Sequence, residues 1–151
     1  MILQGLLYIN SIDVYTMYGA FLTENRASDN TNYGALLNPA AMKPCVAVSF
    51  REENGEKLPE VLVPRSEARD VTLQFAIFAE NASAFLQKYT DFIQFLISGW
   101  LDINLPELNK TFRMYLVSFN SYEQLTPVTT DSGVVVASRF KVKFREPNPS
   151  F

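Results

Sequence analysis

Histidine is absent from this sequence of 151 residues, and cysteine occurs once, at Cys45. Without histidine there is no Ser-His-Asp or Cys-His catalytic arrangement, and the side chain that most often moves protons near neutral pH is missing. Most zinc sites also need histidine or several cysteines. A single cysteine excludes a disulfide within the chain. We therefore expect no enzymatic activity, no metal ion and no cofactor.

Long apolar runs and concentrated positive charge are also missing. Lys88 and Asp91 interrupt the most apolar segment, residues 81–100, which falls short of the about 18 consecutive apolar residues of a membrane span. The start, MILQGLLYIN, lacks the basic region of a signal peptide. The 13 Lys and Arg residues are scattered among 16 Asp and Glu, so the electrostatic footprint of a nucleic-acid-binding protein is absent. We expect synthesis in the cytoplasm and no membrane partner.

The composition is that of an ordered globular protein. Hydrophobic residues make up 48% of the sequence and charged residues 19%, which excludes disordered and fibrous classes. A chain of this length can bury a sizeable core on its own. We expect a single domain over residues 1–151.

Alternation with a period of two dominates the sequence and predicts seven or eight strands. The segment RDVTLQFAIFA places Val71, Leu73, Phe75 and Ile77 on one face. WLDINLP and TFRMYLVSF alternate in the same way. VVVASRFKVKF separates its apolar residues from a basic face made of Arg139, Lys141, Lys143 and Arg145. Near the start, LLYINSIDVYT predicts two short strands around a turn at Asn10-Ser11.

One helix is expected, over residues 82–98. Asn81 suits the N-cap position and Gly99 suits the residue that ends a helix. Phe85, Tyr89, Phe92 and Leu96 recur at helical spacing and form a wide apolar face. Such a helix can cover the open side of a curled sheet. The expected fold is mainly β, a β-sandwich or split β-barrel flanked by this single helix.

Two further segments suggest contacts with partners. Residues 17–44 show little periodicity and predict a long irregular arm, while residues 46–64 predict a β-hairpin turning at Asn54-Gly55. Aromatic and Met residues without regular structure are typical of subunit interfaces. The interface candidates are Tyr18, Gly19, Phe21, Leu22, Tyr33, Leu36, Leu37, Met42, Asn54 and Gly55. Pro59 and Pro64 lack an amide donor, so we expect the return strand at a sheet edge.

Other chemistry is weakly supported. Asp91, Asp102 and Glu107 are carboxylates that nothing in the sequence brings around one substrate, and we interpret them as solvated charges. Cys45 lacks a histidine base and is interpreted as an unreactive thiol. The basic face of the last strand suits solvent or a neighbouring subunit better than phosphate.

The order of these segments resembles a known family. INSIDVYTMYGAFL leads through an irregular loop and a hairpin to RDVTLQFAIFAENASAFLQKYTDFIQFL, then to GWLDINLPELNKTFRMYLVSF and a last strand ending in KFREP. This arrangement resembles the N-terminal domain of the distal tail proteins of long-tailed bacteriophages. That domain is itself similar to tail-tube proteins and to the tube protein of type VI secretion.

The resemblance, which covers nearly the whole chain, implies a virion structural protein of a phage or prophage tail. Copies would form a hexameric ring at the junction of tube and baseplate or within the tube, contact other tail or baseplate proteins, and let DNA pass without specific binding. Tyr18-Gly19 would match the family's tyrosine-glycine turn. Residues 21–44 and 46–63 would match segments that contact neighbouring subunits or stacked rings.

Two alternatives stay open from the sequence. One is an oligomeric protein-binding adaptor of prophage or secretion-system origin. The other is a small-ligand-binding β-barrel or an enzyme, which would need a deep pocket holding Asp102 or Glu107 with a raised pKa.

Overall fold

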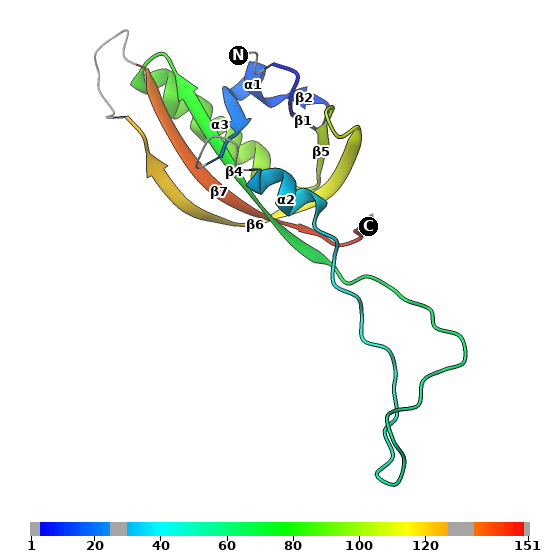
Figure 1. Cartoon of the computed structure of the whole chain (residues 1–151). Coiled ribbons are helices and arrows are strands. Elements are labelled where there is room, and N and C mark those ends of the chain that lie inside the picture. The colour runs from blue at the N-terminus through cyan, green and yellow to red at the C-terminus, as the bar shows by residue number, and fades with distance from the viewer. Residues whose placement is uncertain (1–3, 25–29, 127–134, 150–151) are drawn as a thin grey trace.

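The computed structural model describes residues 4–24, 30–126 and 135–149 and shows a curled antiparallel sheet with one long helix packed against it (Figure 1). The strands in the described residues are β1 (Tyr8–Ile9), β2 (Ile12–Asp13), β3 (Ala20–Leu22), β4 (Arg69–Ala79), β5 (Leu101–Leu105), β6 (Lys110–Gln124) and β7 (Val136–Glu146). The helices are α1 (Val14–Tyr18), α2 (Thr31–Leu37) and α3 (Ala82–Ile97). The expected mainly β fold is confirmed.

The strands form a half-barrel in the order β2-β1-β5-β6-β7-β4-β3. The long strands β4 and β7 pair over their whole length, from Arg69 opposite Glu146 to Ala79 opposite Val136. Both are internal strands, since β6 pairs with the other side of β7 and β3 with the other side of β4. Because the sheet curls, α3 can cover its inner face while contacting β4, β6 and β7.

The core lies between α3 and the inner face of the sheet. The alternation read from the sequence is confirmed: Val71, Leu73, Phe75 and Ile77 are buried on β4, as are Val136, Ser138, Phe140, Val142 and Phe144 on β7. The Phe75 ring lies 5.5 Å from Phe92 of α3 and 6.1 Å from Phe140. Aromatic contacts of this kind add to the free energy gained by burying the rings.

Helix α3 begins at the residue that the sequence predicts and ends within one residue of the predicted end. The Asn81 side chain accepts a hydrogen bond from the Ala84 amide at 2.9 Å, which satisfies one of the free amides of the first turn. Gly99 follows the last turn with φ of +136°, a conformation that favours glycine. The predicted turn between β1 and β2 is also present, with Asn10 and Ser11 both at positive φ.

The segment expected to be an irregular arm is different. Its described residues up to Leu37 fold onto the body as the end of α1, then β3 and α2, and the chain leaves the body only after Leu37. Partners distant in sequence create this order: β3 pairs with β4, and the Glu24 carboxylate accepts hydrogen bonds from the Thr31 and Asn32 amides at the start of α2. A single-sequence pattern contains no signal for such contacts. The helix over 82–98 is thus accompanied by two short helices.

Candidate interaction surfaces

Residues 38–68 form a long projection, here called the arm, that extends away from the body (Figure 1). Its two legs run antiparallel and meet at isolated bridges, Met42 with Ser66 near the body and Val48 with Lys57 near the tip. Main-chain hydrogen bonds of 2.9 and 2.7 Å join Val48 and Lys57 in both directions. The hairpin predicted at 46–64 is therefore the outer part of this arm, and its return leg lies outside the sheet.

The arm exposes apolar side chains over its whole length. Every residue from Ala41 to Arg65 is exposed, and Val46 retains 81% of its accessible surface. The exposed large apolar residues are Met42, Val46, Val48, Phe50, Leu58, Val61, Leu62 and Val63. Between the two bridges the legs separate around a space of about 570 Å³, lined by five of these side chains together with Cys45 and three prolines. Exposed apolar surface of this extent marks an interaction site.

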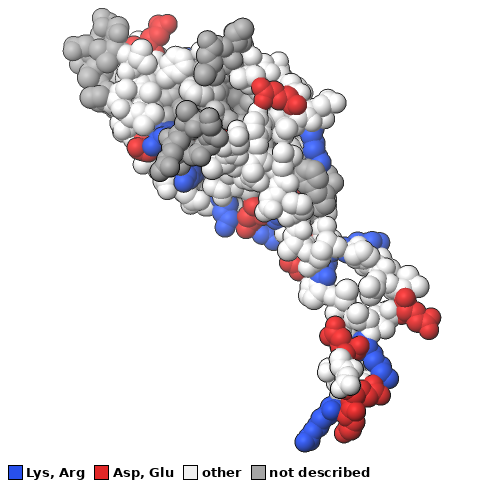
Figure 2. Space-filling view, viewed as in Figure 1, with Lys and Arg blue, Asp and Glu red and all other residues white. Residues whose placement is uncertain are grey.

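Charged side chains gather at the far end of the arm (Figure 2). Between Val48 and Leu62 the chain has four glutamates and two basic residues, so this end carries net negative charge. The Lys57 ammonium lies 3.1 Å from the Glu53 carboxylate and 5.4 Å from the centre of the Phe50 ring. Both members of this ion pair are half exposed or more, so its contribution to stability is small.

The base of the arm is fixed to the body by Arg69, the first residue of β4. Its Nε lies 3.3 Å from Oε1 of Glu146, the last residue of β7, and only 6% and 3% of the two side chains is exposed. Another guanidinium nitrogen of Arg69 donates a hydrogen bond to the main-chain oxygen of Asn38. One side chain thus connects both ends of the arm to the sheet.

A second surface lies along the outer half of β6. Strand β5 pairs with β6 only from Lys110 to Met114, and beyond that point β6 pairs with β7 alone within the described residues. The strand from Tyr115 to Gln124 therefore has one free edge. Exposed apolar side chains lie along this half of β6: Tyr115, Val117, Phe119 and Tyr122. Tyr122 contacts α3 through Tyr89, with 5.7 Å between the ring centres.

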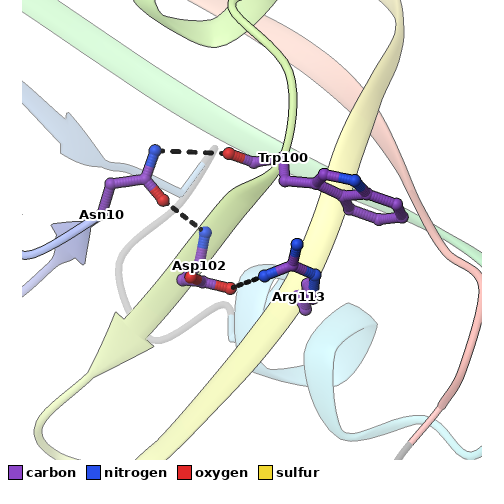
Figure 3. Close-up of polar contacts among 4 residues, drawn as sticks. All are labelled: Asn10, Trp100, Asp102 and Arg113. Atoms are coloured by element: carbon purple, nitrogen blue, oxygen red, sulfur yellow. Dashed lines mark hydrogen bonds and ion pairs between the residues drawn. The ribbon is translucent and has the colours of Figure 1, made fainter.

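Trp100, the only tryptophan, marks the start of this free edge. Its main-chain oxygen accepts a hydrogen bond from Asn10 Nδ2, and Asn10 Oδ1 accepts one from the Asp102 amide at 2.8 Å (Figure 3). Arg113 pairs with Asp102 at 3.4 Å, and its guanidinium lies 4.7 Å from the centre of the Trp100 ring. The indole, 49% exposed, is held in a fixed position at the surface.

The body contains five of the predicted interface residues in its own packing. Tyr18 lies 5.5 Å from Phe92 and 5.4 Å from Phe95, measured between ring centres. Burial, and secondarily Asp91, raises the pKa of Tyr18. Gly19 is buried with φ of +67°, and Phe21 contacts Tyr15 and Phe78. Leu22 packs against the core. Leu36 was expected at a subunit interface, but in the single chain it is 0% exposed and belongs to the hydrophobic core.

Tyr33 of α2 is half-buried, and its hydroxyl donates a hydrogen bond to the Glu107 carboxylate. That hydrogen bond, with burial and the charges of Glu107 and Glu24, raises the pKa of Tyr33 to about 12. The contact fixes α2 to the turn between β5 and β6. Tyr33 therefore stabilises the body in the isolated chain.

The other predicted interface residues are exposed. Leu37 lies at the end of α2, Met42 in the first leg of the arm, and Asn54 and Gly55 at its tip. The return strand expected at a sheet edge is instead an exposed leg outside the sheet, and none of its apolar residues is among the interface candidates. The free edge of β6 was not predicted. The return leg had a readable signal, because LPEVLVP is apolar and contains two prolines that disfavour an internal strand. The free edge had none, because it depends on which strands pair.

The carboxylates considered for chemistry lie in separate contacts. Asp91 accepts hydrogen bonds from Gln87, Asp102 pairs with Arg113, and Glu107 accepts from Tyr33. In the described parts of the chain, no group of three or more metal-binding side chains occurs. Helices long and apolar enough to cross a membrane are also not found there.

A scan against models of known protein families finds no match. A search of curated proteins finds none either. Among solved structures, the chain is similar to the Dit protein of phage SPP1, described as a paradigm of the hub adsorption apparatus in phages that infect Gram-positive bacteria. The identity is 9% and the TM-score 0.49, and the match covers 94% of this chain. This chain spans half the length of that structure.

Proposed function

We propose that this chain is a structural subunit of a phage or prophage tail that assembles with copies of itself into a ring, with the arm as the contact to the neighbouring copy. The observation that carries the proposal is the arm, which exposes eight large apolar side chains and extends away from the described part of the body. The order of elements, which resembles that of distal tail proteins, supports the place in a tail. The function is mechanical, since the ring holds tail parts together and lets DNA pass.

Ring formation requires two different surfaces on each copy. A contact in which one patch meets a different patch on the next copy closes into a ring when the rotation allows it. The arm provides one such patch and leaves the body at one end, so it does not cover its own sheet. An interface between permanent subunits is expected to be apolar at its centre, as the arm is.

Fixing the arm to the body prepares it for this role. The Arg69 contacts hold both legs at their base before a partner arrives. A segment already held in its bound direction loses less conformational entropy on association than a free one. The arm should therefore bind its partner without first having to become ordered at its base.

Sedimentation velocity on the full chain tests the proposal. We expect large assemblies that grow with concentration, and we expect a variant with Val46, Val61 and Val63 changed to serine to stay monomeric with an unchanged free energy of unfolding. Met17→Ser removes an exposed apolar side chain of the body and serves as the control. A wild-type chain that remains monomeric at millimolar concentration would contradict the proposal.

The place in a tail needs a separate experiment. In particles purified from a producing host, mass spectrometry should detect the protein at a fixed ratio to the other tail proteins. A transient adaptor would be absent from purified particles and present only in cell extracts. Detection only in extracts would favour the adaptor alternative.

A further inference from the structure

The free edge of β6 is an unfinished part of the sheet. Among the described residues, no strand pairs with Tyr115 to Gln124 on the side away from β7, over about ten residues or ~34 Å. The pairing with β7 shifts register between Leu116 and Ser118 and between Asn120 and Glu123, so the edge consists of short regular pieces. Such an edge is a template for one more strand. Natural edges are usually short, and the terminal strands β2 and β3 are indeed two and three residues long. In the described residues, the part of β4 before Phe75 also has no strand beside it on the side away from β7.

Side chains around the edge favour an apolar partner. Val117 and Phe119 are 46% and 40% exposed, and Tyr122 of the same stretch is 50% exposed. Trp100 lies at the start of the edge, held by Arg113 and by Tyr115, whose ring centre is 5.7 Å away. Rigid exposed aromatic residues are the type that dominates binding energy in protein interfaces.

The arm has the matching properties. Its legs are extended and largely without pairing between the two bridges, so their main-chain groups are available. Val61, Leu62 and Val63 of the return leg are all exposed, so an added strand formed by this leg presents apolar side chains whichever way it faces. The arm leaves its own body away from the arrowhead of β6, so a copy's own arm does not occupy its own edge (Figure 1).

Charge favours the same occupant. The outer face of the sheet beside β6 carries Arg113, Arg139, Lys141, Lys143 and Arg145 against the carboxylates Asp70, Asp102 and Glu123. This face is net positive, while the outer part of the arm is net negative. Opposite charges on two approaching surfaces accelerate encounter and orient it.

We propose that the free edge of β6, from Tyr115 to Gln124, receives the arm of a second copy as an added strand. The proposal rests on the proposed function and names the surface at which the arm is bound. The added strand pairs with the main-chain groups of β6, its valines cover Val117 and Phe119, and Trp100 packs against its flank. Repeating this contact from copy to copy extends one sheet around the assembly.

Disulfide trapping on the full chain tests this contact, because Cys45 is the only native thiol and lies in the arm. Three single variants, Val117→Cys, Phe119→Cys and Ser121→Cys, place a second thiol along the free edge. Gln87→Cys places one on α3 as a matched control for random collision. Each variant is held in a glutathione redox buffer at an assembling concentration, and covalent dimers are counted on a non-reducing gel.

We expect at least one edge position to form covalent dimers ten-fold more than Gln87→Cys, with loss of the signal when Cys45 is changed to Ser. Val117→Lys should weaken assembly at least ten-fold, while Thr111→Lys, on the part of β6 that β5 covers, should leave it within three-fold. If the wild type assembles but no edge position exceeds the control, the arm binds elsewhere and this inference is wrong. If the wild type does not assemble at any concentration, the proposed function itself fails.

A separate titration with duplex DNA tests whether this side of the sheet binds nucleic acid instead. A 30-base-pair duplex is titrated into wild type and into Lys141→Glu at low salt. We expect the wild type and Lys141→Glu to show the same weak or absent DNA binding. The contrary result has two parts: the wild type binds DNA in a salt-sensitive way, and Lys141→Glu loses this binding while its assembly is unchanged. That result would show that this side of the sheet binds nucleic acid and would overturn the proposal.

Discussion

Arg69 and Glu146 form a buried ion pair, with 3.3 Å between Nε and Oε1, across the ends of β4 and β7. The two residues are 77 positions apart in the sequence and lie where the arm joins the body. Removing one member would leave an unpaired charge in a site that water does not reach. The pair therefore stabilises the sheet end and fixes the direction of the arm.

Replacing Arg69 with Ala should lower the free energy of unfolding by about 3–5 kcal/mol, the cost of leaving a buried charge without its partner. The double variant Arg69→Met with Glu146→Leu should recover most of this loss, because two apolar side chains need no counter-charge. Urea unfolding of the three proteins measures both effects. A loss below about 1 kcal/mol for the single variant would show that the site is not dry.

The two glycines that follow tyrosines have opposite expected responses to alanine. Gly19 has φ of +67°, and a Cβ there would lie 2.8 Å from the main-chain oxygen of Phe78. We expect Gly19→Ala to cost about 2 kcal/mol or more from backbone strain and this close approach. Gly34 lies inside α2 with open space around it, so Gly34→Ala should stabilise by roughly 0.5–1 kcal/mol. Thermal unfolding of both variants checks the difference in sign.

Stability at alkaline pH should depend on Tyr33. Its pKa is about 12 in the folded chain and about 10 when unfolded, so the folded state holds the proton more tightly. The stabilisation is fully present below pH 10 and is lost as pH rises from 10 to 12. Tyr33→Phe should cost about 1 kcal/mol at pH 8 and almost nothing near pH 12. A cost that does not change with pH would mean that the ring, and not the hydroxyl, stabilises α2.

The sequence predicted the parts of this fold that depend on local pattern. The alternation in β4 and β7, the helix capped by Asn81 and the turn at Asn10-Ser11 are all confirmed, because each follows from residues near one another. Those signals also gave the fold class. They depend on periodicity and on side chains that favour particular backbone angles.

Features formed by distant residues were not predictable from such patterns. Tyr18 and Leu36 have the composition of an interface segment, but contacts with α3 and the core place them in the body. The free half of β6 exists because β5 begins opposite Met114, which depends on sheet order. The exposed return leg of the arm depends on where the chain leaves the body after Leu37.

If another copy covers the arm, Cys45 becomes protected on assembly, and the reactivity of its thiol measures this directly. The rate of its reaction with a maleimide should be recorded from nanomolar to high micromolar protein, with sedimentation velocity run on the same samples. The account predicts that the rate falls at least ten-fold over the concentrations at which assemblies appear. Assemblies that form while Cys45 reacts as fast as in the monomer would contradict it.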